Sequence, residues 1–267
     1  MIKLCAFADE ADKSVRGQID ALHRNNIELI ELRGLDGVNV SKLTEQEAER
    51  YAAVFKAEGI KVWSIGSPLG KIKLSDDLEE HMRLTRHVCR LAKIFGTDKI
   101  RMFSFYEWEG KDDLVFSCLA EMVKIAEEEG VKLCHENEKR IYGDTCERTL
   151  RVLDKVRGLG CVYDPANFLE VKEDSAMTLD ALHGRADYFH IKDVISETGE
   201  LVPAGYGDGR IGELVGRLPL DRDTVLTLEP HLKVFSGYSE FDESEMKNRF
   251  KFESNGEAFD AAVAALK

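Results

Sequence analysis

The sequence VKLCHEN (131–137) is an apolar run that ends close to a carboxylate, Glu136. Three later runs have the same form, namely GCVYDPA (160–166), DYFHIKD (187–193) and TVLTLEP (224–230), and they carry Asp164, His190 and Glu229. Successive runs lie roughly 30 residues apart, about the length of one strand–helix unit in a barrel of eight units. As consecutive strands, they would bring the four side chains to one end of such a barrel.

Four further strand-like runs precede these: IKLCAFA (2–8), IELIEL (27–32), IKVWSIG (60–66) and KIRMFSF (99–105). Amphipathic segments between the runs predict helices over 14–25, 44–58, 76–96, 112–130, 144–157, 176–184, 211–218 and 256–267. Strands that alternate with helices predict a parallel sheet, because parallel neighbours need crossover connections. We therefore expect an α/β fold, a (β/α)8 TIM barrel that forms a single domain over residues 1–267.

A doubly wound open sheet is the alternative fold. Such sheets more often carry a glycine-rich phosphate loop after the first strand. Here the corresponding turn reads ADEADKS (8–14) and contains no glycine. The closed barrel is therefore the favoured interpretation.

The composition narrows the classes of function. The chain has 267 residues, 43% of them hydrophobic, and a formal net charge of -13. So acidic a surface repels the phosphates of nucleic acids and anionic membranes, and we expect neither as a partner. The start MIKLCAFADEAD (1–12) lacks the basic residues and long apolar stretch of a signal peptide, and no run is long enough to span a membrane. Six cysteines without a CxxC pair favour reduced thiols and a cytoplasmic protein.

The four side chains at the strand ends form a candidate metal site. Active sites of barrels lie at the carboxyl ends of the strands, and two Glu, one Asp and one His supply the oxygen-rich ligand set that suits a divalent cation. Two of the residues alone have a simpler interpretation: Asp164 before Pro165 could cap a helix, and His190 could be a core residue. Glu136 and Glu229 are harder to explain otherwise, because a carboxylate after an apolar strand is costly to bury unless it is paired or bound to a metal. Their occurrence on four consecutive predicted strands favours the site.

The chain resembles the xylose isomerase-like TIM barrel superfamily of sugar phosphate isomerases and epimerases. The resemblance spans almost the whole chain and is carried by IELIELRGLDG (27–37), WSIGSPLGKI (63–72), CHENEKRIYGD (134–144), VYDPANF (162–168), FHIKD (189–193), GYGDG (205–209) and LTLEPH (226–231). Because these barrels also host dehydratases and DNA-repair endonucleases, the resemblance indicates the fold more sharply than the substrate.

In the isomerase and epimerase members, a Glu, an Asp, a His and a second Glu hold one divalent cation. By motif these would be Glu136, Asp164, His190 and Glu229, and the cation would be Mn²⁺, Mg²⁺, Co²⁺ or Zn²⁺. Such a cation stabilises the enediolate that forms when a ketose loses its α-proton. Glu136 and Glu229 would remove and return that proton. The resemblance thus implies an isomerase or epimerase of a small sugar or sugar phosphate.

Five further residues are candidate substrate contacts. Lys192, two residues past the predicted His ligand, could bind a substrate oxygen or phosphate, or it could be a solvent-exposed lysine. Asn167 resembles a polar residue that contacts substrate or metal-bound water in the superfamily. Trp63, Arg101 and Tyr142 lie at the ends of other strands or just beyond, where aromatic rings either wall a pocket or belong to the core.

Three other features have open interpretations. Asp193 could orient the predicted histidine ligand or cap a helix. The glycine-rich loop 205–209 could wrap around a substrate or be an ordinary turn. Region 231–253 follows the last strand on the side of the predicted site, so it could form a lid or contact a partner. A homo-oligomer is compatible with the sequence.

The chain departs from two superfamily patterns, and these departures limit the reactions that the resemblance implies. The endonuclease members bind three zinc ions with extra histidines near the third and fourth strands, which here end in WSIGS (63–67) and RMFSF (101–105). The His…Glu…Arg pattern of simple ketose epimerases is also loose here, with Glu197, Glu200 and Arg210 after the seventh strand. A dehydratase of an inosose- or dehydroshikimate-like substrate and a non-catalytic sugar- or metal-binding barrel therefore remain alternatives.

Overall fold

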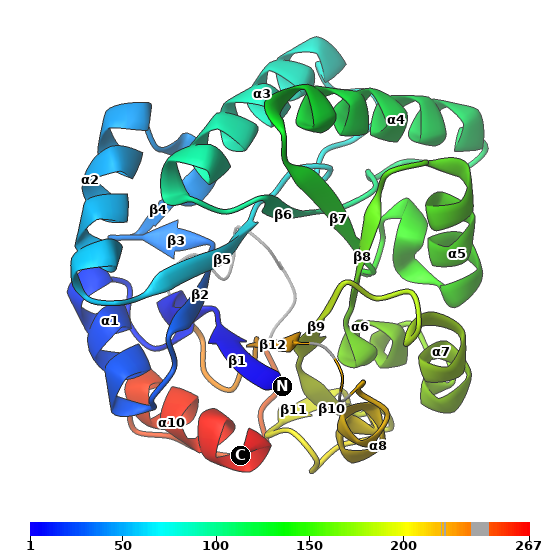
Figure 1. Ribbon diagram of the computed structural model, residues 1–267. Coiled ribbons are helices and arrows are strands. Elements are labelled where there is room, and N and C mark those ends of the chain that lie inside the picture. The colour runs from blue at the N-terminus through cyan, green and yellow to red at the C-terminus, as the bar shows by residue number, and fades with distance from the viewer. Residues whose placement is uncertain (220, 222, 236–245) are drawn as a thin grey trace.

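The computed structural model describes residues 1–219, 221, 223–235 and 246–267. Eight parallel strands close into a barrel in the order β1-β12-β9-β8-β7-β6-β5-β2, surrounded by helices (Figure 1), which confirms the predicted (β/α)8 fold. Every barrel strand lies within one of the predicted runs. The strands are β1 Ile2–Ala6, β2 Leu29–Leu32, β5 Lys61–Gly66, β6 Lys99–Met102, β7 Lys132–Glu136, β8 Gly160–Tyr163, β9 Tyr188–Ile191 and β12 Thr224–Leu228.

A helix is found in each of the predicted helical segments. They are α1 Val15–Arg24, α2 Glu45–Ala57, α3 Leu78–Phe95, α4 Asp112–Glu129, α5 Cys146–Lys155, α7 Ser175–Leu182, α8 Ile211–Gly216 and α10 Asn255–Leu266. The final helix α10 lies beside α1 (Figure 1), where Arg24 and Asp260 form an ion pair at 2.8 Å. The two ends of the chain thus close the outer layer of helices.

Local sequence explains the helix boundaries. The Thr44 side chain accepts a hydrogen bond from Glu47 N–H, and the Glu47 carboxylate accepts one from Thr44 N–H, which is the capping box predicted for α2. Helices α3 and α4 both end at glycines with left-handed backbone, Gly96 and Gly130. Capping of this kind sets where each helix returns the chain to the barrel.

The sequence did not predict several short elements. They are the hairpin β3 Gly34–Leu35 and β4 Val38–Asn39, the hairpin β10 Asp193–Ile195 and β11 Glu200–Val202, the helix α6 Pro165–Glu170, and the short 3-10 helices Ala8–Glu10, Val40–Lys42 and Tyr142–Asp144. Segments this short show no hydrophobic period, so a pattern search passes over them. Most of them follow the carboxyl ends of barrel strands, where they build the loops around the candidate site.

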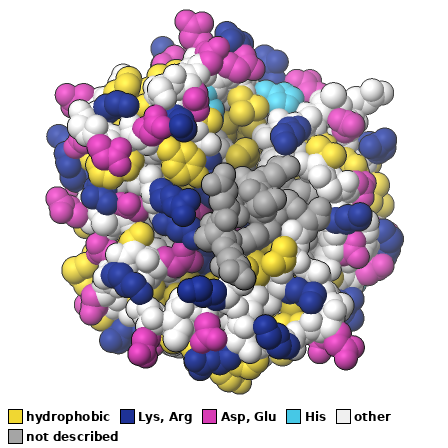
Figure 2. All heavy atoms as spheres, turned by 180° about the vertical axis from the view of Figure 1, so that it is seen from behind, with side chains coloured by type: hydrophobic (Ala, Val, Ile, Leu, Met, Phe, Trp, Pro, Cys, Tyr) yellow, Lys and Arg dark blue, Asp and Glu magenta, His cyan; other side chains and the backbone are white. Residues whose placement is uncertain are grey.

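The surface and the cysteines agree with the composition. Acidic and basic side chains are interspersed over the face drawn in Figure 2, so charges of both signs are spread across it. All six cysteines are buried free thiols. Among the described helices, none combines the length and the apolar character needed to cross a lipid bilayer.

Candidate functional site

The structure brings the four predicted metal ligands together at one end of the barrel. Glu136 ends β7, Asp164 follows β8, His190 lies in β9 and Glu229 follows β12. One potential ligand atom from each lies within 4.8 Å of the others, and all four residues are buried. Nδ1 of His190 is 3.0 Å from Oε1 of Glu136 and 3.1 Å from Oε2 of Glu229.

Asp164 shows that this cluster fits a cation. Its Oδ1 accepts a hydrogen bond from Asn167 N–H at 3.1 Å, so it caps α6, as one interpretation of the sequence held. Its Oδ2 is buried and accepts no hydrogen bond, although it lies 3.2 Å from Nζ of Lys192 in an ion pair. Burial raises the pKa of Asp164 to about 7. The nearby carboxylates of Glu136 and Glu229 also raise this pKa, and Lys192 lowers it. A divalent cation would bind this oxygen and relieve the repulsion among the carboxylates.

Glu31 on β2 orients the His190 ring through the nitrogen Nε2. Its Oε2 lies 3.2 Å from Nε2 of His190, and its Oε1 accepts a hydrogen bond from the Tyr188 hydroxyl at 2.9 Å. With Nε2 engaged by a carboxylate, Nδ1 is the nitrogen that faces the cluster, which is the arrangement usual for metal-binding histidines. Burial lowers the pKa of His190, but Glu136 and Glu31 raise it well above its usual value. We did not predict Glu31, although a carboxylate within the apolar run IELIEL (27–32) was the available signal.

Two arginines hold the glutamates in place. Arg33 binds Oε1 of Glu229 at 2.9 Å and Oδ2 of Asp9 at 2.9 Å. Arg101 places Nε 3.1 Å from Oε2 of Glu136. Each glutamate therefore has one oxygen near a guanidinium and the other near His190. The guanidinium and imidazole groups together fix the orientation of both carboxylates.

A second acidic group lies next to the first. Glu10, Glu229 and His231 also bring potential ligand atoms within 4.8 Å of one another. Nε2 of His231 is 3.4 Å from carboxylate oxygens of both glutamates. Burial raises the pKa of Glu229, but hydrogen bonds with His190 and His231 hold it well below its usual value. His231, whose geometry after Pro230 was uncertain from the sequence, thus belongs to the site.

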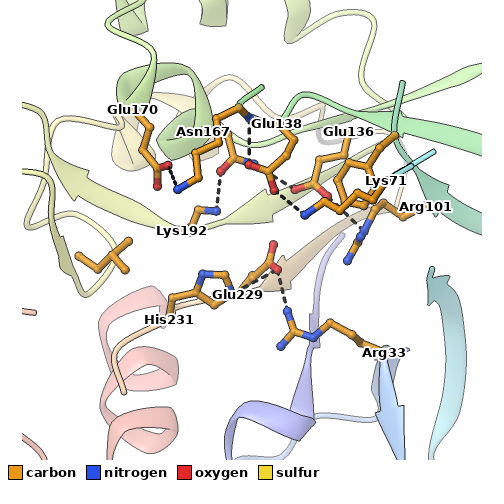
Figure 3. A pocket seen from close by; sticks show the side chains of 13 residues that line it. Arg33, Lys71, Arg101, Glu136, Glu138, Asn167, Glu170, Lys192, Glu229 and His231 are labelled. Atoms are coloured by element: carbon orange, nitrogen blue, oxygen red, sulfur yellow. Dashed lines mark hydrogen bonds and ion pairs between the residues drawn. The ribbon is translucent and has the colours of Figure 1, made fainter. Parts of the chain in front are cut away.

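A pocket opens over the cluster, and Arg101, Asn167 and Lys192 line it together with Glu136 and Glu229 (Figure 3). Nζ of Lys192 donates a hydrogen bond to Oδ1 of Asn167 at 2.6 Å. The structure therefore places three of the five candidate substrate contacts in the pocket.

The other two candidates, Trp63 and Tyr142, lie elsewhere. The Trp63 ring packs edge-on against Tyr188 inside the barrel, and Lys99 lies over it. Tyr142 is buried against Trp108 and against Phe116 of α4, and its hydroxyl donates to Asp112 at 3.2 Å. Strand-end position alone did not distinguish an aromatic residue in a pocket from one in the core.

Two roles were predicted for Asp193, to orient His190 or to cap a helix, and the structure shows neither. Its carboxylate accepts hydrogen bonds from the backbone N–H groups of Val194, Gly205, Gly207 and Gly209. A Cβ atom on Gly207 would lie 2.4 Å from Oδ1 of Asp193. The glycines of the loop 205–209 thus allow the backbone to wrap around this carboxylate, which gives the loop a structural role.

The segment 231–253, predicted to be a lid or a partner contact, is described only in part, because residues 236–245 lie outside the described residues. On its near side His231 lines the pocket. On its far side the Lys247 carbonyl accepts a hydrogen bond from Leu201 N–H at 2.8 Å, next to the hairpin strand β11.

Comparison with known families identifies the fold family. A family model described as a xylose isomerase-like TIM barrel matches residues 19–240. The chain belongs to this family. No curated protein matches the chain.

Solved structures of this family resemble the chain over its full length. The probable 3-DHS dehydratase AsbF from Bacillus anthracis has a TM-score of 0.74 and 18% identity, covering 100% of this chain and 98% of that one. An L-ribulose 3-epimerase has a TM-score of 0.72 and 18% identity, covering 99% and 94%. The IOLI protein, described with a binding zinc atom, has a TM-score of 0.71 and 16% identity, covering 98% and 96%. At such identities the likeness establishes the fold.

Proposed function

We propose that this protein is a divalent-metal-dependent isomerase or epimerase of a small sugar or sugar phosphate. The supporting observation is the cluster of Glu136, Asp164, His190 and Glu229, whose ligand atoms lie within 4.8 Å of one another beneath the pocket. These four residues would hold Mn²⁺, Mg²⁺, Co²⁺ or Zn²⁺. When bound, the cation would polarise the carbonyl and the neighbouring hydroxyl of a ketose and stabilise the charge that develops as the α-proton leaves.

Glu136 and Glu229 would carry the proton. They approach His190 from strands β7 and β12, with β8 and β9 between them in the barrel. Arg101 and Arg33 each hold one oxygen of these carboxylates in place. If one glutamate removes the proton and the other returns a proton to the opposite face, the configuration of that carbon is inverted, which is epimerisation. If the proton returns to the neighbouring carbon, the result is a ketose–aldose isomerisation.

Lys192 and Asn167 would position the substrate. The Asn167 side chain is itself fixed, because its Nδ2 donates to the Asn137 carbonyl at 2.9 Å and approaches Oε1 of Glu136 at 3.3 Å. Lys192 is then held on Asn167. An ammonium fixed beside the metal ligands can bind a hydroxyl or carbonyl oxygen of a ligand without first losing side-chain freedom.

Dehydration is the second candidate reaction, and Lys192 is the observation that favours it. An elimination breaks a C–H bond and a C–O bond, so it needs a base and also an acid that protonates the departing hydroxyl. A glutamate could serve as the base, and the Lys192 ammonium, 3.2 Å from Oδ2 of Asp164, could serve as the acid. The fold resemblance to a probable dehydratase is consistent with this alternative.

Solvent exchange would distinguish these functions. The metal-loaded protein is incubated in deuterium oxide with a panel of ketoses, ketose phosphates and cyclic keto-polyols, and each is followed by NMR. Deuterium uptake at an α-carbon without loss of water supports the isomerase or epimerase. A new conjugated-enone absorbance supports the dehydratase. Metal binding with neither signal across the panel would favour a non-catalytic sugar-binding barrel.

A further inference from the structure

The aromatic ring of Phe7 contacts three groups of the candidate site at once. Phe7 directly follows β1, and its side chain is completely buried. The guanidinium carbon Cζ of Arg33 lies 4.4 Å from the centre of this ring, and Cζ of Arg101 lies 5.4 Å from it. The imidazole of His190 packs against the ring nearly at a right angle, with 5.2 Å between the two ring centres. One apolar side chain therefore joins two arginines and a candidate metal ligand.

Each of these three groups also contacts a glutamate that we propose as a base. Arg33 lies 2.9 Å from Oε1 of Glu229, and Arg101 lies 3.1 Å from Oε2 of Glu136. The histidine that packs on the ring approaches the other oxygen of each glutamate, at 3.1 and 3.0 Å. A displacement of this one ring would therefore be passed on to both carboxylates.

The two arginines share the Phe7 ring. Arg33 also lies over the ring of Phe235 and Arg101 over the ring of Phe103, both at 4.5 Å. Of these three rings, Phe7 is the one that contacts both guanidinium groups. The electron-rich face of an aromatic ring attracts a cation, and this attraction is stronger where water is excluded. Phe7 is thus suited to hold two cations in fixed positions inside a buried network of charges.

Gly66, at the end of β5, makes room for the ring. A Cβ atom on Gly66 would lie 2.4 Å from Cε1 of Phe7 and 3.4 Å from Nη2 of Arg101. This glycine belongs to a regular strand, so its small size is what matters here. On the other side, the Phe7 N–H donates a hydrogen bond to the Leu228 carbonyl of β12 at 3.1 Å. The barrel therefore fixes the backbone of Phe7 and leaves a gap that fits its ring.

We propose that Phe7 is a positioning residue: its ring fixes the two arginines, and the arginines fix the glutamates that would transfer the proton. The inference rests on the proposed function, which gives Glu136 and Glu229 the role of bases. Proton transfer depends steeply on the position of the base, whereas substrate binding uses other contacts in the pocket. Loss of the ring should therefore lower the rate of proton transfer more than the affinity for substrate.

Phe7→Met tests the role of the ring, because methionine keeps most of the apolar volume but has no aromatic face. We expect kcat for deuterium exchange into a substrate from the panel to fall at least about tenfold, while KM stays within about twofold of the wild type. Mn²⁺ affinity should fall about tenfold, and the Co²⁺ absorption spectrum should change, because two candidate ligands lose their fixed orientation.

Phe259→Met is the matched control. Phe259 is also buried, at 1% exposure, but it lies on α10 in the outer layer of helices (Figure 1). It should lose a similar amount of stability in thermal melting and keep the wild-type kcat, Mn²⁺ affinity and Co²⁺ spectrum. Equal losses of kcat and Mn²⁺ affinity in both variants would trace the effect to general stability and would overturn the proposal.

Gly66→Ala provides an independent second variant, because it keeps Phe7 but displaces its ring. It should lower kcat and change the Co²⁺ spectrum as Phe7→Met does. Wild-type kcat and an unchanged Co²⁺ spectrum in folded Phe7→Met, or in folded Gly66→Ala if Phe7→Met does not fold, would overturn the proposal. A wild type that binds Mn²⁺ but exchanges no deuterium would contradict the proposed function instead, and the Co²⁺ spectra would still decide whether Phe7 positions the ligands.

Discussion

The two ends of the barrel interior differ sharply although the same strands build them. At the amino end the inward side chains form an apolar layer, the floor: Cys5, Cys134, Val162, Tyr188 and Val225. Two residues further along, on the same face of the chain, Cys134 gives way to Glu136, Val162 to Asp164 and Tyr188 to His190. With Glu31, Arg33, Arg101 and Glu229 these three form the mouth, whose residues are all buried.

The difference separates stability from function. The floor is stabilised by burial of apolar surface, which needs no partner of specific geometry. The mouth holds buried charges that are costly unless each is paired. Burial, together with the neighbouring Glu136 and Glu229 carboxylates, raises the pKa of Asp164 to about 7. Such crowding opposes folding and favours cation binding, so substitutions at the two ends should have opposite consequences.

Glu229→Gln at the mouth should have the largest effect. It removes a candidate ligand and its charge, so we expect Mn²⁺ affinity and turnover to fall by more than about 100-fold, beyond the loss typical of an outer partner. Folding should be preserved, because Arg33 keeps its ion pairs with Asp9 and Glu10. Calorimetric Mn²⁺ titration and thermal melting measure the two quantities.

Val225→Ala, on the floor of the same strand, is the matched control. It should lower the free energy of unfolding by about 2 kcal/mol through lost apolar contacts and leave Mn²⁺ affinity unchanged. If Glu229→Gln unfolds the protein while the wild type binds no metal, the mouth is structural and the comparison fails.

The loop 69–74, whose Lys71 lines the pocket beside the mouth, should be more sensitive to acid than the floor. His81 accepts a hydrogen bond from Gly70 N–H at 2.9 Å, and burial lowers the pKa of His81 to about 4. Above about pH 6.5 the folded and unfolded chains are both neutral at this residue. Below that pH only the unfolded chain takes up the proton, so stability falls until about pH 4, by on the order of 3 kcal/mol.

Urea unfolding at pH 7 and at about pH 4.5 measures this loss. His81→Gln lacks the titrating ring, so its stability should fall less over the same range than that of the wild type. Hydrogen exchange at low pH should show residues 69–74, which His81 anchors, opening before the floor. An equal loss in both proteins would mean that His81 contributes no acid sensitivity.

Glu31→Gln should show how far metal binding depends on a residue that contacts a candidate ligand without being one. A glutamine can donate to Nε2 of His190 and so favour the tautomer with a proton on Nδ1, the nitrogen that faces the cluster. We expect Mn²⁺ affinity to fall by about 10- to 100-fold and the Co²⁺ absorption spectrum to change. Tyr188→Phe removes only the hydroxyl that binds Glu31 and should have a smaller effect. Unchanged Co²⁺ spectra in both variants would restrict the site to its four candidate ligands.

Much of this architecture was readable from the sequence because it follows from local periodicity. The runs that predicted eight strands contain all eight barrel strands, and the apolar-to-charged step from Val162 to Asp164 lies within one run. The failures came where the local pattern was ambiguous. Trp63 lies within β5 and Tyr142 begins the 3-10 helix after β7, and both pack against other aromatic side chains outside the pocket. Asp193 binds the glycine-rich loop instead of His190.

The sequence by itself determined the strand–helix alternation and the strand ends on which Glu136, Asp164, His190 and Glu229 lie, because these features depend on spacing along one segment. Only the tertiary structure decided which partners they meet. Arg33 reaches Glu229 across 196 residues, and Glu31 reaches His190 across 159. These contacts exist because β1 pairs with both β2 and β12, and this pairing brings together segments that lie far apart in the sequence.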